Sequence, residues 1–368
     1  MPEPTKSSPS PQAKSQVKSQ AKSQTNTEEK GKLIGGILLL VLCAAAGIAI
    51  VVAIKGTGKG PTNLNTSDGQ LAQGQTADAI LNSFLALQRE NRLSEAEAVL
   101  KAGVAQYTQE QRMAAAYAEF LAIQRRPEES YAMFERALAI GPRVAALEFN
   151  AGTVAVKIGK RDRAIEHYAA AQAQDPTDYR YPLFLAQVQL QDNQIDESRM
   201  NLFMAARLKD DAPVVWGTLA EIALRENSLD IALQHITKAR ALEPQYWLWR
   251  LLEARTWKRK GEPQKGLDLL VGLDDADKGR LSVLNEMSEC YGLLGTPEEA
   301  ADAFALFSDR APTDADLAMQ AAIWSDRVKR PNQAVRFAER AANLKVVGAE
   351  ALLERLTKAP IATPADTK

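Results

Sequence analysis

Residues that carry chemistry are scarce in this 368-residue chain, which contains only two histidines and two cysteines. His167 and His235 belong to no His-x-x-x-His spacing, and the cysteines form no Cys-x-x-Cys pair, so no metal-binding motif is present. A phosphate-binding Gly-x-x-x-x-Gly-Lys loop and a Gly-x-Ser-x-Gly nucleophile elbow are missing as well. We therefore expect a protein that is not an enzyme and that needs no cofactor or metal.

Aromatic residues are also few, at 6% of the chain, whereas alanine, leucine, glutamate, glutamine and arginine are plentiful. This composition favours closely packed helices over β-sheet. The net charge is −1 and gives no basic surface, so no nucleic-acid partner is expected. Cys43 lies in an apolar run far from Cys290, which makes an intrachain disulfide implausible.

The N-terminal part has a different composition from the rest. Residues 1–32 are rich in Ser, Gln, Lys and Pro, and the tetrapeptide Ala13-Lys14-Ser15-Gln16 recurs twice, once with Val17 in place of the alanine. Such a segment cannot bury enough apolar surface to offset the entropy of ordering it, so we expect a disordered basic tail. Residues 55–76 are rich in Gly, Thr, Asn and Gln and are expected to form a flexible linker.

Between the tail and the linker, residues 33–54 contain no charge. As a helix this run spans roughly 33 Å, enough for a hydrocarbon core of about 30 Å. A cleaved signal peptide has a shorter apolar region, a lipoprotein signal has a small residue where Leu42 precedes Cys43, and a buried soluble helix is rarely apolar all round. We interpret the run as an uncleaved transmembrane helix that makes the protein a single-pass membrane protein.

Lysines near the predicted span indicate its orientation. Residues 13–32 hold five lysines and residues 55–74 hold two. Because cytoplasmic flanks carry the excess of positive charge, the N-terminus is expected in the cytoplasm and the large C-terminal part in the periplasm or another extracytoplasmic space. The alternative is the reverse topology, with the C-terminal part facing the cytosol.

The C-terminal part repeats itself with a period of 34 residues. Counted from Ala77, small residues stand at the eighth place of seven of the eight repeats and at the twentieth place of all eight. Two antiparallel helices can approach closely only where such small side chains cross. Gly or Asn stands at the fifteenth place in six repeats, where the turn between the helices needs a positive φ. Proline at the thirty-second place ends the second helix in four repeats.

This pattern resembles the tetratricopeptide repeat. The fifth repeat carries Trp216, Leu219, Ala220, Ala232, Ala239 and Pro244 at the family's positions. The sixth repeat departs from the pattern after Leu270, which leaves its local geometry open. The resemblance covers residues 77–348 and implies an all-α, right-handed superhelical solenoid of about eight repeats. Residues 349–358 are expected to form a capping helix and residues 359–368 a disordered tail.

In this family the first helices line a concave groove that binds a peptide or protein partner at places two, five, nine and twelve. No repeat has the lysine and asparagine pair with which some members clamp a terminal carboxylate. The resemblance therefore implies partner binding without that clamp. The candidate groove residues are Phe149, Arg180, Leu183, Gln187, Glu221, Leu248, Leu251, Arg255, Lys258, Asn285 and Glu289.

The sixth repeat adds an aromatic and basic cluster around Trp249, Trp257, Arg255 and Lys258, which is either a binding hot spot or part of the core. The sequence predicts a membrane-anchored scaffold, similar in layout to bacterial proteins of export, folding or complex assembly in the cell envelope. A self-assembling homo-oligomeric platform and a receptor with cytosolic repeats are the alternatives.

Overall fold

The structure, a computed structural model, describes residues 75–358. Within this range it contains helices and connecting turns and no strand, which confirms the all-helical prediction. The predicted tail 1–32, transmembrane segment 33–54, most of the linker 55–76 and the end 359–368 lie outside the described residues. Among the residues from 75 to 358, no helix has the length and apolar character needed to cross a membrane.

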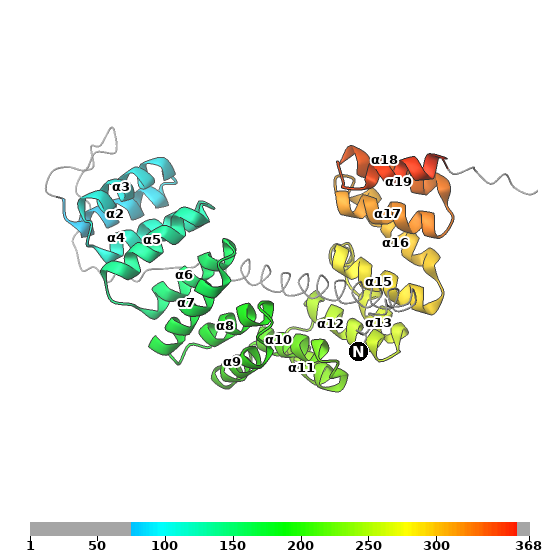
Figure 1. The fold of residues 1–368 in the computed structure, drawn as a ribbon, viewed down its shortest axis with the longest axis horizontal. Helices are drawn as coiled ribbons and strands as arrows, with labels where there is room; N and C mark the ends of the chain where they lie inside the picture. Colours follow the sequence, from blue (N-terminus) through cyan, green and yellow to red (C-terminus); the bar gives the residue numbers. More distant parts are fainter. Residues whose placement is uncertain (1–74, 359–368) are drawn as a thin grey trace, which may run out of the picture. The chain divides into compact units, whose positions relative to one another are not determined.

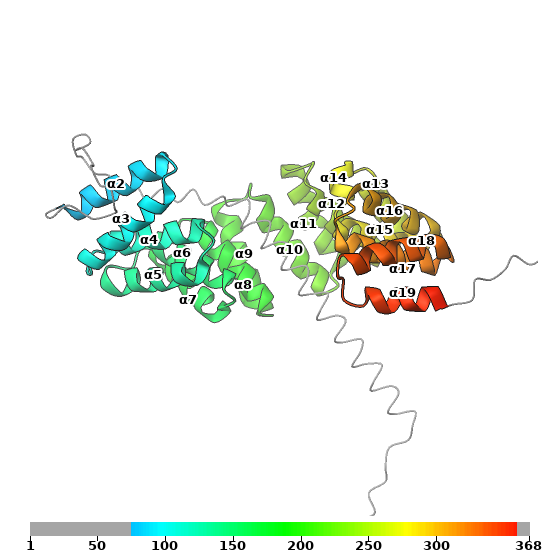
Figure 2. The same ribbon diagram turned by 90° about the horizontal axis from the view of Figure 1, so that it is seen from above.

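The chain divides into two compact units after Asp210 (Figures 1 and 2). The first unit contains α2 (Ala77–Arg89), α3 (Leu93–Gln106), α4 (Gln111–Ile123), α5 (Pro127–Ile140), α6 (Ala145–Lys157), α7 (Arg161–Gln174), α8 (Arg180–Gln191) and α9 (Ile195–Leu208). The second contains α10 (Pro213–Arg225), α11 (Leu229–Leu242), α12 (Trp247–Arg259), α13 (Pro263–Val271), α14 (Asp275–Lys278), α15 (Leu281–Leu294), α16 (Pro297–Arg310), α17 (Ala315–Arg327), α18 (Pro331–Asn343) and α19 (Ala349–Lys358).

The helices follow the 34-residue period. Seven first helices begin at the predicted residue, and α8 begins one residue later, at Arg180. Within each unit, a first helix packs against its own second helix, and the second helix packs against the next first helix. Each unit is therefore a stack of helical hairpins, as Figure 1 shows.

The small residues lie where the two helices of a hairpin touch. The small residues at the eighth and twentieth places are buried. Phe84, which stands at the eighth place of the first repeat, is buried too, and so are the large residues at the twenty-fourth place. The contact is close enough for Ser130 Oγ to donate a hydrogen bond to the backbone oxygen of Ala118, at 2.7 Å. Ser198 makes the same bond to Ala186, also at 2.7 Å. Both bonds satisfy the serine hydroxyl inside the core, where an unpaired one is costly.

The turn between the helices uses the left-handed conformation at place fifteen in all eight repeats. Glycine and asparagine hold six of these positions, as the sequence predicts. Arg125 and Lys329 take the same conformation in the remaining two repeats, with φ of 58° and 60°. Because a side chain with a Cβ rarely adopts this region, the helical stack on both sides imposes the turn there.

The sixth repeat has the irregular geometry that its sequence left open. Its second helix, α13, has nine residues, whereas its counterparts have 13 or 14. Gly272 ends it, and the short α14 follows, capped by Asp274, whose Oδ1 accepts a hydrogen bond from Asp277 N at 2.8 Å. Leu273 still reaches the core at 6% exposure, so the hairpin keeps its apolar contact although the helix is shorter.

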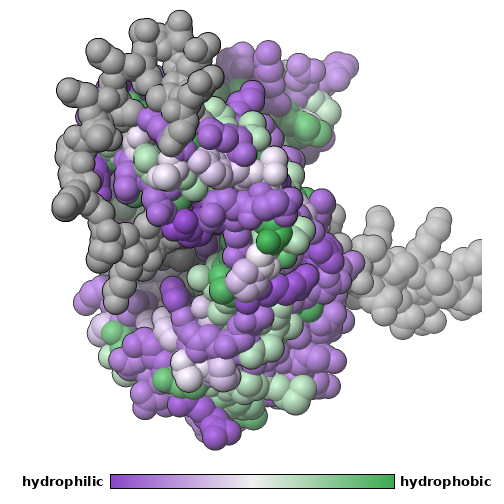
Figure 3. All heavy atoms as spheres, turned by 90° about the vertical axis from the view of Figure 1, so that its left-hand side faces the viewer, coloured by the Kyte–Doolittle hydropathy of each residue, from purple (hydrophilic) through white to green (hydrophobic). Residues whose placement is uncertain are grey.

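The last helix covers the end of the stack. Leu352, Leu353 and Leu356 of α19 pack against a core cluster that includes Phe337 and Ala338. The outer surface drawn in Figure 3 is mainly hydrophilic, with apolar side chains in small separate groups. The apolar residues of the repeats thus lie mostly between helices, where their burial stabilises the stack.

Substituting alanine for two helical glycines tests the close contact, because we expect one substitution to destabilise the fold and the other to stabilise it. A Cβ on Gly266 would lie 2.7 Å from the backbone oxygen of Ala254, whereas a Cβ on Gly292 would meet nothing within 4 Å. We expect Gly266→Ala to lower the free energy of unfolding by about 1 kcal/mol or more. Gly292→Ala should raise it by about 0.5–1 kcal/mol, because alanine favours the helix. Denaturant unfolding of the full-length chain measures both changes, and equal stabilisation by the two variants would contradict the close contact.

Candidate functional site

The candidate groove residues of the first unit lie on the first helices α6 and α8. Phe149 is half-buried, Arg180 is exposed, and Leu183 and Gln187 are buried. The Phe149 ring belongs to an aromatic cluster, with centroids 5.4 Å from Tyr181 and 5.0 Å from Phe184. The Arg180 guanidinium lies 5.8 Å from the Phe149 centroid. Phe149 and Arg180 are thus brought together where α6 meets α8.

Gln187 has an unusual environment for an amide. Its side chain is 4% exposed, and neither Nε2 nor Oε1 has a hydrogen-bond partner among the described residues. Two residues along the same helix, Gln189 is also buried but accepts a hydrogen bond from Asn201 Nδ2 at 2.8 Å. A buried amide without partners costs free energy, which sets Gln187 apart from Gln189.

Glu119 stands at place nine of the second repeat, the place that Gln187 holds in the fourth. Its Oε1 lies 3.5 Å from Nδ2 of the buried Asn150. Burial raises the pKa of the Glu119 carboxyl to about 8. Glu119 stands at one of the family's groove places but is not among the candidate residues, and Asn150, at place six, is not at a groove place.

In the second unit, the apolar candidates Leu248 and Leu251 are buried on α12, and Glu221 is buried on α10. Glu221 accepts a hydrogen bond from Arg225 at 2.8 Å, while its other carboxylate oxygen has no hydrogen-bond partner among the described residues. Burial raises the pKa of Glu221, and the nearby Arg225 and Arg255 partly oppose the shift.

The cationic candidates of α12 are paired with carboxylates of the next first helix, α15. Arg255 Nε lies 3.0 Å from Glu286, and Lys258 Nζ lies 2.5 Å from the same carboxylate. Lys258 also pairs with Glu289, which is exposed, and the half-buried Asn285 lies on the same helix. These contacts join the sixth and seventh repeats and pair the charges of Arg255 and Lys258.

The tryptophans of the sixth repeat divide between core and surface. Trp249 is fully buried and lies over Gly217, where a Cβ would approach the ring to 2.0 Å. Trp247 is 6% exposed, so both residues belong to the core. Trp257 is half-buried and has Lys265 Nζ 4.5 Å from its centroid. The aromatic and basic cluster is therefore smaller at the surface than the sequence suggests.

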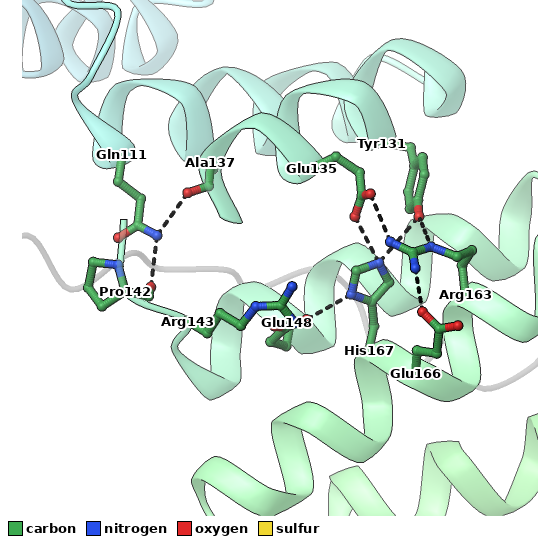
Figure 4. Close-up of polar contacts among 10 residues, drawn as sticks. All are labelled: Gln111, Tyr131, Glu135, Ala137, Pro142, Arg143, Glu148, Arg163, Glu166 and His167. Carbon is green, nitrogen blue, oxygen red and sulfur yellow. Dashed lines mark hydrogen bonds and ion pairs between the residues drawn. The ribbon is translucent and has the colours of Figure 1, made fainter. Parts of the chain in front are cut away.

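A second polar cluster joins the second and third repeats (Figure 4). His167 Nδ1 lies 2.7 Å from Glu148 Oε2, and its Nε2 lies 3.1 Å from Glu135 Oε1. Glu148 is fully buried and also pairs with Arg143, at 3.1 Å. On the other side, Arg163 pairs with Glu135 at 2.9 Å. The cluster is satisfied by α5, α6 and α7 themselves, so its role is to hold two hairpins together.

The reactive side chains of the described residues form no metal site, and the free cysteine among them is buried. Within the range 75–358, no three His, Cys, Asp or Glu side chains are grouped to hold a metal ion. Cys290 is buried, and burial raises the pKa of its thiol to about 11.

The raised pKa of Glu119 predicts how stability varies with pH. Between its ordinary value of 4.5 and about 8, the folded chain holds a proton that the unfolded chain has released. Stability contributed by this group is present below the lower value and is lost as the pH rises to about 8. We expect Glu119→Gln to flatten this decline, measured as unfolding midpoints across the range. The exposed Glu128→Gln is the matched control, and an unchanged slope in Glu119→Gln would contradict the burial.

Comparison with protein-family models and with curated proteins gives no match for the sequence. Among solved structures, a tetratricopeptide repeat protein from Parabacteroides merdae is similar, with a TM-score of 0.53 and 11% identity over 77% of this chain and 100% of that one. PilF from Pseudomonas aeruginosa matches with a TM-score of 0.49, at 19% identity over 58% of this chain and 97% of that one. PilW, a type IV pilus biogenesis factor, also has a TM-score of 0.49, at 16% identity over 58% and 98%.

At such identities a structural likeness concerns the fold alone. The Parabacteroides merdae structure and the 34-residue helical hairpins lead to the same conclusion. The part of the chain between residues 75 and 358 has the tetratricopeptide-repeat fold.

Proposed function

We propose that this chain is a membrane-anchored scaffold whose first helices bind an extended segment of a partner protein. The observation that carries the proposal is the Gln187 amide, buried and without a partner among the described residues. A peptide bond offers one N–H donor and one C=O acceptor, which match the oxygen and nitrogen of a glutamine side chain. An extended peptide can therefore satisfy both polar atoms at once.

The surroundings of Gln187 favour a partner segment with apolar side chains. Leu183 precedes it by one turn of α8, and Phe149 and Arg180 lie nearer the start of that helix. Apolar and aromatic surface with a few placed polar groups is typical of protein sites that bind ligands. Glu119 adds a carboxyl that is mostly protonated near neutral pH, and a protonated carboxyl can donate a hydrogen bond to a backbone carbonyl.

The basic residues of the second unit do not favour an acidic partner segment. Arg255 and Lys258 are already paired with Glu286, so an acidic peptide would have to displace that carboxylate to reach them. Breaking such a buried pair is costly. The proposed partner segment is therefore recognised by its backbone and its apolar side chains more than by its charge.

Membrane anchoring is the second part of the proposal. The uncharged run 33–54 supports it, and the lysines before that run support a cytoplasmic N-terminus with the repeats outside the cytoplasm. A scaffold held at a membrane in this way suits the export, folding or assembly of envelope proteins, the role suggested by the resemblance of its layout.

Binding is tested with a random peptide library displayed on phage and selected against the full-length chain. We expect enriched peptides to lose about tenfold in affinity with Gln187→Leu, because the peptide bond loses its partners. Gln234→Leu, which changes an exposed glutamine on α11, is the matched control and should leave affinity unchanged. Fluorescence anisotropy with the selected peptides measures both. Equal affinities for wild type and Gln187→Leu would refute the proposed site.

Orientation is tested by protease treatment of intact cells and of cells with a permeabilised outer membrane. We expect the repeats to be cut only after permeabilisation, while a tag on residue 1 stays protected, because the lysine-rich flank is cytoplasmic. A cytoplasmic protein of the same cells serves as the control for lysis. Digestion of the N-terminal tag with intact repeats would reverse the topology.

A further inference from the structure

Helix α9 carries an apolar face that the hairpin stack does not cover. Met200 is 61% exposed, Phe203 48%, Met204 42% and Leu208 43%. Their spacing of three and four residues places them on one side of the helix. The opposite side of α9 is buried through Ser198, Leu202 and Ala205, which face its own hairpin. The exposed face therefore contributes nothing to the core of the first unit.

The same places in neighbouring repeats show that this face is not a requirement of the fold. Residues 200, 203 and 204 of α9 correspond to Glu166, Ala169 and Ala170 of α7 and to Gln234, Thr237 and Lys238 of α11. Those helices pack against their hairpin partners just as α9 does, with alanine or polar residues at the outer places. A contiguous exposed apolar face on one helix of a repeat array marks an interaction surface.

The charged residues beside this face are acidic at the start of α9 and basic at its end. Asp196 and Glu197 are exposed near the start of α9, and Arg207 is exposed near its end. If two such faces meet in antiparallel fashion, the acidic start of one lies beside the basic end of the other. A parallel arrangement would place like charges together, which is unfavourable.

We propose that α9 docks antiparallel against α9 of a second copy of this chain. In the register that places Glu197 opposite Arg207 of the other copy, Met200 of each copy lies opposite Met204 of the other. Two ion pairs then flank an apolar centre that both copies share, as a twofold interface requires. Methionine and phenylalanine suit such a centre, because both are enriched at protein interfaces.

The interface is small. One 14-residue helix from each copy buries less than the roughly 1,200–2,000 Å² of a stable complex, so the pairing is weak in solution. Anchoring of both copies in one membrane, where the proposed function places them, raises their local concentration. The docking itself rests on α9 and does not depend on peptide binding by the first helices.

Charge reversal distinguishes this arrangement from other contacts. Two differently tagged full-length chains are produced together, and the fraction of one that copurifies with the other is measured. Glu197→Arg in both copies should reduce recovery roughly tenfold, and Arg207→Glu in both should do the same, because each places like charges opposite one another. Glu197→Arg in one copy and Arg207→Glu in the other should restore recovery. Failure of this mixed pair to recover would overturn the antiparallel docking.

Disulfide crosslinking tests the register in the same tagged chains, with Cys43→Ser as background and the buried Cys290 retained. Met200→Cys in one copy and Met204→Cys in the other should form a crosslinked dimer under mild oxidation. The matched control is Gln234→Cys with Lys238→Cys, at the same two places of α11. A dimer from the control pair in equal yield, or none from the α9 pair, would overturn the proposal.

Discussion

The close approach of two helices at small residues is the contact on which the rest of this structure depends. Alanine, serine and glycine at places eight and twenty let the helices of each hairpin touch, down to a serine hydroxyl bonded to the backbone across the crossing. Each second helix then packs against the first helix of the next hairpin in the same unit. Within each unit, that repeated crossing positions the first helices and the candidate binding residues they carry.

Polar groups on the first helices are handled in two ways. Some are paired, as in the contact of Glu148 with His167 within the third hairpin and those of Arg255 and Lys258 with Glu286 between the sixth and seventh hairpins. The first pair stabilises a single hairpin, and the second joins two adjacent repeats. Gln187 is the contrasting case, because its amide is buried and its neighbours on α7, α8 and α9 do not satisfy it. Buried polar groups that are paired within the fold stabilise it, whereas an unpaired one such as Gln187 is a candidate for recognition of a partner.

The two helices of a hairpin can serve different partners. First helices present the residues proposed to bind a peptide, and the outer face of a second helix is free to carry another surface. Only in the fourth repeat does the described part of the chain use that freedom for four exposed apolar side chains. The proposed peptide binding and the proposed self-association therefore involve separate helices.

The sequence by itself determined the helical hairpins, their 34-residue period, the small residues at the crossings and the turn at place fifteen. These follow from local rules, because a helix crossing needs small side chains and a left-handed turn favours glycine or asparagine. Tertiary structure alone decided that Trp249 is core, that Lys258 is paired and that the Gln187 amide is not. It also decided that Met200 and Phe203 are exposed on α9. These outcomes depend on which residues of other helices lie opposite each side chain, and spacing along one chain does not contain that information.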